Sequence, residues 1–114
     1  MPHFVTDCSA SIFKLQLEGS IIETIHAAAK STGLFSEHDI KVRIRPFENY
    51  STGNNVVDFI HVFAYIMEGR TDEQKMNVSK SIVKALVSIF PNVPNIGANI
   101  IEFENANYFN RNKL

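Results

Sequence analysis

The fold is decided by the stretch VVDFIHVFAYIM, residues 56–67, which predicts one long strand because it is rich in β-branched and aromatic residues. Alternate residues of a strand point to opposite faces of its sheet. Both faces are apolar here: the first carries Val57, Phe59, Phe63 and Tyr65, and the second carries Ile60, Val62, Ala64 and Ile66. This pattern is typical of a sheet that is covered on both faces.

After this strand, the sequence predicts a turn and a long helix. The turn is Gly69–Arg70, and Thr71-Asp72-Glu73-Gln74 is a capping box that opens the helix. Pro91 and Pro94 end the helix, and NIIEFE, residues 99–104, is expected to be the last strand. The residues expected to face the core from this helix are Met76, Val83, Leu86, Val87 and Phe90.

Before the long strand, the sequence predicts the same order of elements. A strand at residues 2–8 precedes a helix that ends at Gly33, where a left-handed cap is favoured. The next strand is ended by Pro46 and followed by a polar loop at residues 48–55. The helix is indicated by Leu17, Ile21, Ile22, Ile25, Ala28 and Ala29 at helical spacing, and the strand by Ile40, Val42 and Ile44 alternating with Lys41, Arg43 and Arg45.

These elements form two β-α-β units in tandem, an α+β fold with a four-stranded mixed sheet. We expect a single domain over residues 1–114, with halves at about 2–48 and 56–104 and a C-terminal tail. Right-handed crossovers place both helices on one face of the sheet. The other face is then expected to be buried by further copies of the chain. Cover by a loop or by the C-terminal tail is the alternative.

Composition excludes several classes of function. The formal net charge is −1, and no basic cluster exceeds Lys41, Arg43 and Arg45, so we expect no nucleic-acid partner. No signal peptide and no apolar run long enough to span a bilayer is present, and Cys8 is the only cysteine, which favours the cytoplasm and no membrane. The four histidines lack the spacing of a metal site, and Cys8 is expected to be a small buried side chain.

The second residue offers chemistry that no internal proline can perform. Removal of Met1 would leave Pro2 as a free secondary amine, and an α-amino group titrates near pH 8. A neighbouring cation or apolar walls depress that pKa toward neutrality, where an amine is an efficient general base. The alternative is that Pro2 only follows the initiating residue and caps an edge strand, where its missing N–H is harmless.

The chain resembles the 5-carboxymethyl-2-hydroxymuconate isomerase family of the tautomerase superfamily. The resemblance is carried by Met1-Pro2-His3-Phe4, by Thr32-Gly33-Leu34-Phe35, and by Phe59-Ile60-His61-Val62 continuing to Gly69-Arg70. It implies the tautomerase-like fold of tandem β-α-β units and a homotrimer with inward-facing sheets. It also implies a cofactor-independent isomerase of aromatic-compound degradation, which moves a proton in a 2-hydroxymuconate-type unsaturated dicarboxylate.

The same resemblance implies roles for particular residues. Pro2 would be the catalytic base and acid, and Arg70 would bind a substrate carboxylate, for which a guanidinium has matching geometry. The family commonly has an arginine where this chain has Lys41, and a second one that matches Arg43. Lysine keeps the charge but loses the planar fork, so Lys41, Arg43 or Arg45 could supply the second cation.

Other interpretations stay open at this point. The chain could be a non-catalytic trimeric binding protein on the same fold, since a retained Met1 would make the Pro2 nitrogen an amide. It could also be a Pro-dependent decarboxylase, hydratase or dehalogenase of an unsaturated acid. His61 matches a histidine of the family, but a hydrogen-bonded core histidine is the favoured interpretation.

Overall fold

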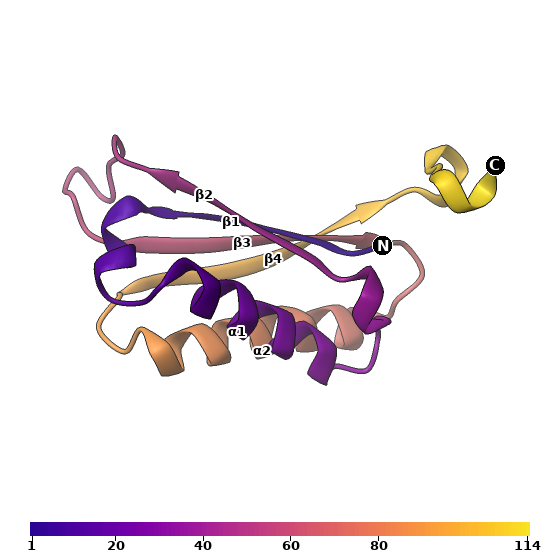
Figure 1. Ribbon diagram of the computed structural model, residues 1–114, viewed down its shortest axis with the longest axis horizontal. Helices are drawn as coiled ribbons and strands as arrows, with labels where there is room; N and C mark the ends of the chain where they lie inside the picture. The colour runs from indigo at the N-terminus through magenta and orange to yellow at the C-terminus, as the bar shows by residue number, and fades with distance from the viewer.

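The structure, a computed structural model, describes residues 1–114 as a sheet with one layer of helices (Figure 1). The strands are β1 (His3–Ser9), β2 (Lys41–Phe47), β3 (Phe59–Met67) and β4 (Asn95–Phe103), and the helices are α1 (Glu18–Ser31) and α2 (Asp72–Ile89). Short 3₁₀ turns are η1 (Ala10–Lys14), η2 (Glu37–Asp39), η3 (Asn105–Asn107) and η4 (Arg111–Lys113).

The sheet has the strand order β2-β1-β3-β4. Strand β1 runs parallel to β2, β3 runs parallel to β4, and the two halves meet where β1 and β3 pair antiparallel. Both helices lie on the same face (Figure 1). The predicted mixed sheet built from two β-α-β units is therefore confirmed.

Local signals in the sequence explain where the helices begin and end. The Thr71 hydroxyl accepts a hydrogen bond from the Gln74 backbone N–H, and the Gln74 side chain accepts one from the Thr71 N–H, which completes the predicted capping box. Gly33 follows α1 with φ of +73°, as predicted for a left-handed cap. Pro46 does not end β2, which continues to Phe47. An edge strand tolerates the missing N–H of proline.

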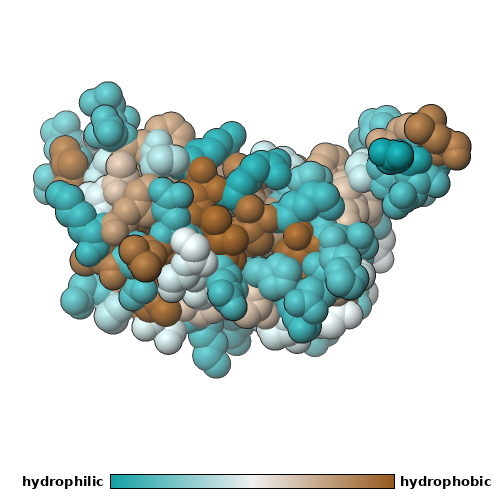
Figure 2. All heavy atoms as spheres, viewed as in Figure 1, coloured by the Kyte–Doolittle hydropathy of each residue, from teal (hydrophilic) through white to brown (hydrophobic).

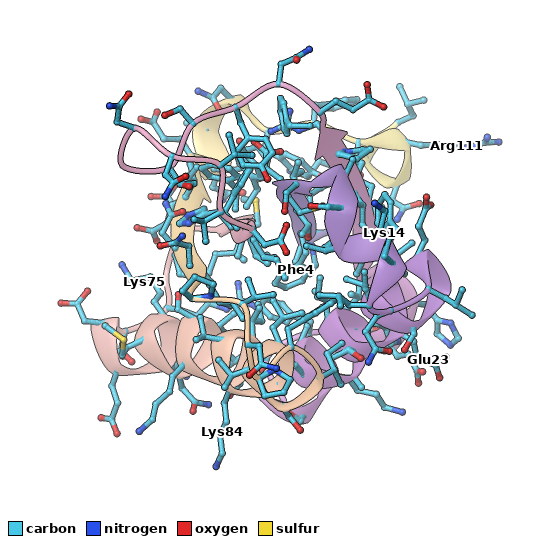
Figure 3. All side chains as sticks on the ribbon, turned by 90° about the vertical axis from the view of Figure 1, so that its left-hand side faces the viewer. Phe4, Lys14, Glu23, Lys75, Lys84 and Arg111 are labelled. Atoms are coloured by element: carbon cyan, nitrogen blue, oxygen red, sulfur yellow. The ribbon has the colours of Figure 1, made fainter.

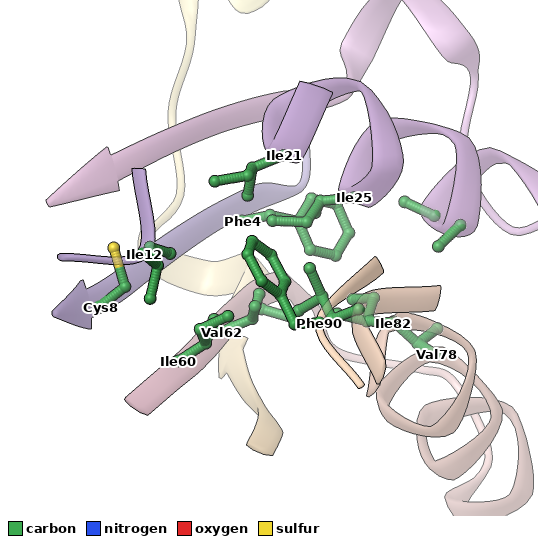
Figure 4. Close-up of a cluster of buried hydrophobic side chains, with 14 of the residues drawn as sticks. Phe4, Cys8, Ile12, Ile21, Ile25, Ile60, Val62, Val78, Ile82 and Phe90 are labelled. Atoms are coloured by element: carbon green, nitrogen blue, oxygen red, sulfur yellow. The ribbon is translucent and has the colours of Figure 1, made fainter. Parts of the chain in front are cut away.

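The core lies between the helices and the sheet (Figure 4). Strands β1 and β3 contribute alternate side chains to it, and each helix contributes a stripe. In a view along the sheet, Phe4 lies inside, whereas the charged ends of Glu23 and Lys84 point away from the helices into solvent (Figure 3). The largest fully buried side chains include Phe4, Ile12, Ile21, Ile25, Ile60, Val62, Ile82 and Leu86.

Two predicted core positions of α2 are wrong. Met76 is 66% exposed and Val87 is 47% exposed, whereas Val78, Ile82 and Leu86 are buried. The buried residues follow one another at intervals of four, which keeps them on one side of a helix with 3.6 residues per turn. Met76 and Val87 lie on the other side. Leu17 is also exposed, because it precedes the first turn of α1.

Strand ends also differ from the predictions. Strand β3 begins at Phe59, and Val56 is exposed in the preceding loop. Strand β4 begins at Asn95, earlier than predicted, because Asn95 pairs with Phe59 at the start of the parallel ladder. The polar and small residues at the start of β4 hid this part of the strand from the hydrophobic pattern.

The face of the sheet without helices, here called the open face, carries His61, Phe63 and Tyr65 of β3 in half-buried positions. At one end, Tyr50 of the loop before β3 packs on Phe59, with ring centroids 5.0 Å apart. The C-terminal tail does not fold back over the open face but extends beyond the end of the sheet (Figures 1 and 2). Arg111 of this tail points away from the body (Figure 3). Cover by the chain's own tail is therefore not what the structure shows.

Candidate active site

The pairing of β1 with β3 brings the amino terminus next to the turn after β3. His3 pairs with Tyr65, so the residues before His3 lie beside the last residues of β3 and the following Gly69–Arg70. A pocket of about 150 Å³ opens there. Its walls come from the amino terminus, the connection between α1 and β2, and the end of β3: Met1, Pro2, Leu34, Phe35, Ser36, Asp39, Ile66, Met67 and Arg70.

Two glycines shape this pocket. Gly33 turns the chain out of α1 and into Leu34–Phe35, and Gly69 has φ of +113° between β3 and Arg70. Both backbone conformations are strained for residues that carry a Cβ atom. Phe35 is fixed by an edge contact with Phe4 of the core, with ring centroids 5.9 Å apart.

Arg70 is held in place by the wall opposite its own turn. Its guanidinium donates a hydrogen bond to the Leu34 carbonyl at 2.9 Å, and its Cζ lies 5.4 Å from the centre of the Phe35 ring. No carboxylate forms an ion pair with Arg70. A guanidinium has five N–H donors, so an anion in the pocket finds a cation that is positioned and not neutralised.

Pro2 is buried, and its carbonyl accepts a hydrogen bond from the Lys41 N–H at 3.1 Å. Met1 precedes it, so the free amine in this structure belongs to Met1, and that nitrogen lies 3.8 Å from a carboxylate oxygen of Asp39. Burial and the positive charge of Lys41 lower the pKa of this amine, Arg70 acts in the same direction, and Asp39 opposes them. An amine at this place is therefore more readily deprotonated than an ordinary terminus.

The three basic residues of β2 lie at increasing distances from this site. Lys41 is beside it and donates from Nζ to the Asp39 carbonyl at 2.8 Å. Arg43 donates to Nδ1 of His3 at 3.1 Å, and Arg45 pairs with Asp7 at 2.7 Å, both on the open face. Pro2 and Arg70 thus line one pocket and Lys41 lies beside it without lining it, while Arg43 and Arg45 lie further away on the open face.

Sequence reasoning missed Asp39 and the apolar wall of Leu34 and Met67. A signal for Asp39 was present, because a residue just before β2 must lie near the start of β1 once the two strands pair in parallel. That signal needs the strand order, which the hydrophobic pattern alone does not supply.

Two other candidate side chains lie away from the pocket. His61 is hydrogen-bonded as predicted, with Nε2 at 2.7 Å from Oδ1 of Asn99, but it lies on the open face and not in the core. Cys8 is fully buried as predicted, and burial raises the pKa of its thiol to about 11. No three His, Cys, Asp or Glu side chains lie close enough together to hold a metal ion. No helix is long and apolar enough to cross a bilayer.

Solved structures share this fold at low sequence identity. A 5-carboxymethyl-2-hydroxymuconate isomerase from Deinococcus radiodurans R1 has a TM-score of 0.83 and 17% identity, over 96% of this chain and 88% of that one. N1, a member of the cis-3-chloroacrylic acid dehalogenase family, has a TM-score of 0.81 and 13% identity, over 98% and 82%. A fused 4-OT that forms an asymmetric trimer has a TM-score of 0.79 and 14% identity, over 96% and 92%.

Sequence comparison identifies a family for this chain but no single related protein. No curated protein matches it by sequence. The model of one family, described as 5-carboxymethyl-2-hydroxymuconate isomerase, matches residues 2–113, nearly the whole chain. With the tautomerase-like fold already established, this match shows that the chain belongs to the 5-carboxymethyl-2-hydroxymuconate isomerase family.

Proposed function

We propose that this chain, after removal of Met1, isomerises a 2-hydroxymuconate-type unsaturated dicarboxylate with the Pro2 amine as base and acid. The observation that carries the proposal is that Pro2 and Arg70 line one pocket although they are far apart in the sequence. The family match supports an isomerase of the tautomerase superfamily. We place the reaction in the cytoplasm, in the degradation of aromatic compounds.

The proposed reaction needs only one proton-transfer group. The neutral Pro2 nitrogen takes a proton from the substrate, and the electrons of the broken bond enter the conjugated system as a dienolate. The resulting ammonium returns the proton to a carbon of that conjugated system. One amine can perform both steps when its pKa lies near the working pH, and burial beside Lys41 and Arg70 lowers the pKa of an amine at this place.

The substrate carboxylates need cations. We assign the first to Arg70, because its remaining N–H donors are available beside Pro2. Lys41 is the second candidate, since its ammonium lies at the same end of the sheet. Arg43 contacts His3 on the open face, so it could bind a substrate carboxylate only if the pocket extends to that face.

We also infer that the protein is a homotrimer that buries the open face. The aromatic residues of β3 on that face are only half-buried in one chain, and the tail does not cover them. Proteins of this fold include a fused 4-OT described as a trimer. A trimer would bring Arg43 and the tail of one copy toward its neighbours.

The test uses processed protein, with removal of Met1 verified by mass measurement. A panel of 2-hydroxymuconate-type dienols should be isomerised, and acetylation of Pro2 or retention of Met1 should abolish turnover while the fold survives. Pro2→Ala, which leaves a primary amine at the same place, should keep partial activity. General-base catalysis contributes about 10²- to 10⁴-fold in rate, so the losses are measurable. Full activity after acetylation of Pro2 would contradict the proposal.

The same experiment addresses the alternatives. Processed protein that binds dicarboxylates but turns over no dienol would favour a non-catalytic binding protein. If the protein only decarboxylates, hydrates or dehalogenates an unsaturated acid, Pro2 remains the proposed base, but the proposed isomerisation is wrong.

A further inference from the structure

Asp39 is the one acidic side chain that lines the candidate pocket. It is the last residue of η2, separated from β2 by Ile40, and its side chain is 59% exposed. Its carboxylate has a single ion-pair partner, the amino-terminal nitrogen of Met1 at 3.8 Å. Lys41 bonds the Asp39 backbone carbonyl and not the carboxylate, so no lysine or arginine neutralises this negative charge.

A backbone hydrogen bond ties residue 2, and not only Met1, to the segment that carries Asp39. The Lys41 N–H donates to the Pro2 carbonyl at 3.1 Å, and this bond joins the start of β2 to residue 2 itself. Asp39 is two residues before Lys41, and Ile40 between them is buried, which fixes the segment. Removal of Met1 therefore moves the amine by one residue but leaves the carboxylate at the same end of the sheet.

We infer that Asp39 is the counter-ion of the Pro2 amine in the processed protein. Its carboxylate stabilises the protonated amine and orients it toward the pocket. This role rests on the proposed function of Pro2 and adds to it. The other charged or titratable groups near the amino terminus are Lys41 on β2, Arg70 after β3 and, on the open face, His3 of β1, and all three are basic. Asp39 is thus the one nearby acidic side chain, and its charge opposes the cations that lower the pKa of the amine, while its backbone carbonyl also accepts from the Met1 nitrogen at 3.4 Å.

The chain offers a matched control for this inference. Glu37 begins the same η2 turn, but its carboxylate pairs with Lys30 at 2.9 Å and with His26 at 3.4 Å, away from the pocket. Asp39→Asn and Glu37→Gln therefore remove the same charge from the same turn. Only Asp39→Asn removes the charge that lies beside the amine.

The experiment is an NMR titration of processed protein labelled with ¹⁵N-proline. Pro2 alone among the four prolines then has a titratable nitrogen. In Asp39→Asn the titration should move to lower pH, with the proton affinity of Pro2 reduced about fivefold, the effect of a unit charge at about 4 Å in water. Glu37→Gln should leave the titration unchanged, and Asp39→Glu should restore most of the wild-type value.

The outcomes separate this inference from the proposed function. An unchanged Pro2 titration in Asp39→Asn, or an equal change in Glu37→Gln, overturns the counter-ion role whether or not the protein turns over a dienol. A selective shift supports the role even in a protein without isomerase activity, because the readout is the amine itself. In an active protein, the acid limb of the pH–rate profile should move in the same direction as the NMR titration.

Discussion

Arg70 is the residue whose substitution tests the site most directly. Its guanidinium is held between the Leu34 carbonyl and the Phe35 ring, so it reaches the pocket with its orientation fixed. Arg70→Ala should weaken binding of a dicarboxylate by about 1.5 to 3 kcal/mol, the value of a hydrogen bond to a charged group. Arg70→Lys should lose less, because it keeps the charge without the planar fork. Steady-state kinetics and inhibitor binding measure both.

Lys84→Ala is the control for that experiment. Lys84 has the same charge, but its side chain points from α2 into solvent and does not line the pocket (Figure 3). A loss of affinity in Arg70→Ala that Lys84→Ala does not reproduce supports carboxylate binding by Arg70. Equal effects would mean that only the summed positive charge matters.

At the residue level, the sequence predicted those members of the candidate site whose chemistry is unusual. A proline at position 2 and an arginine after a glycine turn can be recognised without coordinates, and the structure places both in one pocket. Asp39 could not be recognised in this way, because an acidic residue in a polar turn is ordinary. Its significance comes only from the parallel pairing of β1 with β2.

At the level of the elements, local signals predicted more than burial patterns did. The capping box and the Gly33 cap depend on a few neighbouring residues, and both were predicted correctly. The buried side of α2 depends on where the sheet lies, so Met76 and Val87 were misassigned. The start of β4 was missed because its partner strand, and not its own composition, makes it a strand.

The capping box gives a prediction for α2. Thr71→Ala removes the acceptor of the Gln74 N–H, and it should lower the free energy of unfolding by about 1 kcal/mol. Thr71→Ser keeps the hydroxyl and should cost less. Chemical denaturation at one fixed protein concentration measures the change, since assembly would make stability depend on concentration. A Thr71→Ala variant as stable as the unaltered protein would show that tertiary packing alone fixes the start of α2.

At the scale of the whole molecule, the open face is the feature that one chain leaves incomplete. Val5 of β1 is already buried at 4% exposure, but Phe63 beside it on β3 is only half-buried. Helices cover the opposite face, while the tail leaves the body at the end of the sheet (Figure 1). A sheet with two apolar faces and one helical layer needs a second cover, and further copies of the chain can supply it.

Phe63→Glu tests this assembly. In a trimer closed over the open face, the new carboxylate would be buried without a partner, which costs several kcal/mol, about 3 to 5 for an uncompensated buried charge. The trimer should therefore dissociate or unfold in sedimentation at micromolar concentration. Met76→Glu is the control, because Met76 is exposed on the outer side of α2 and should leave assembly unchanged. If the unaltered chain sediments as a stable, folded monomer, the open face is covered by nothing and the trimer is wrong.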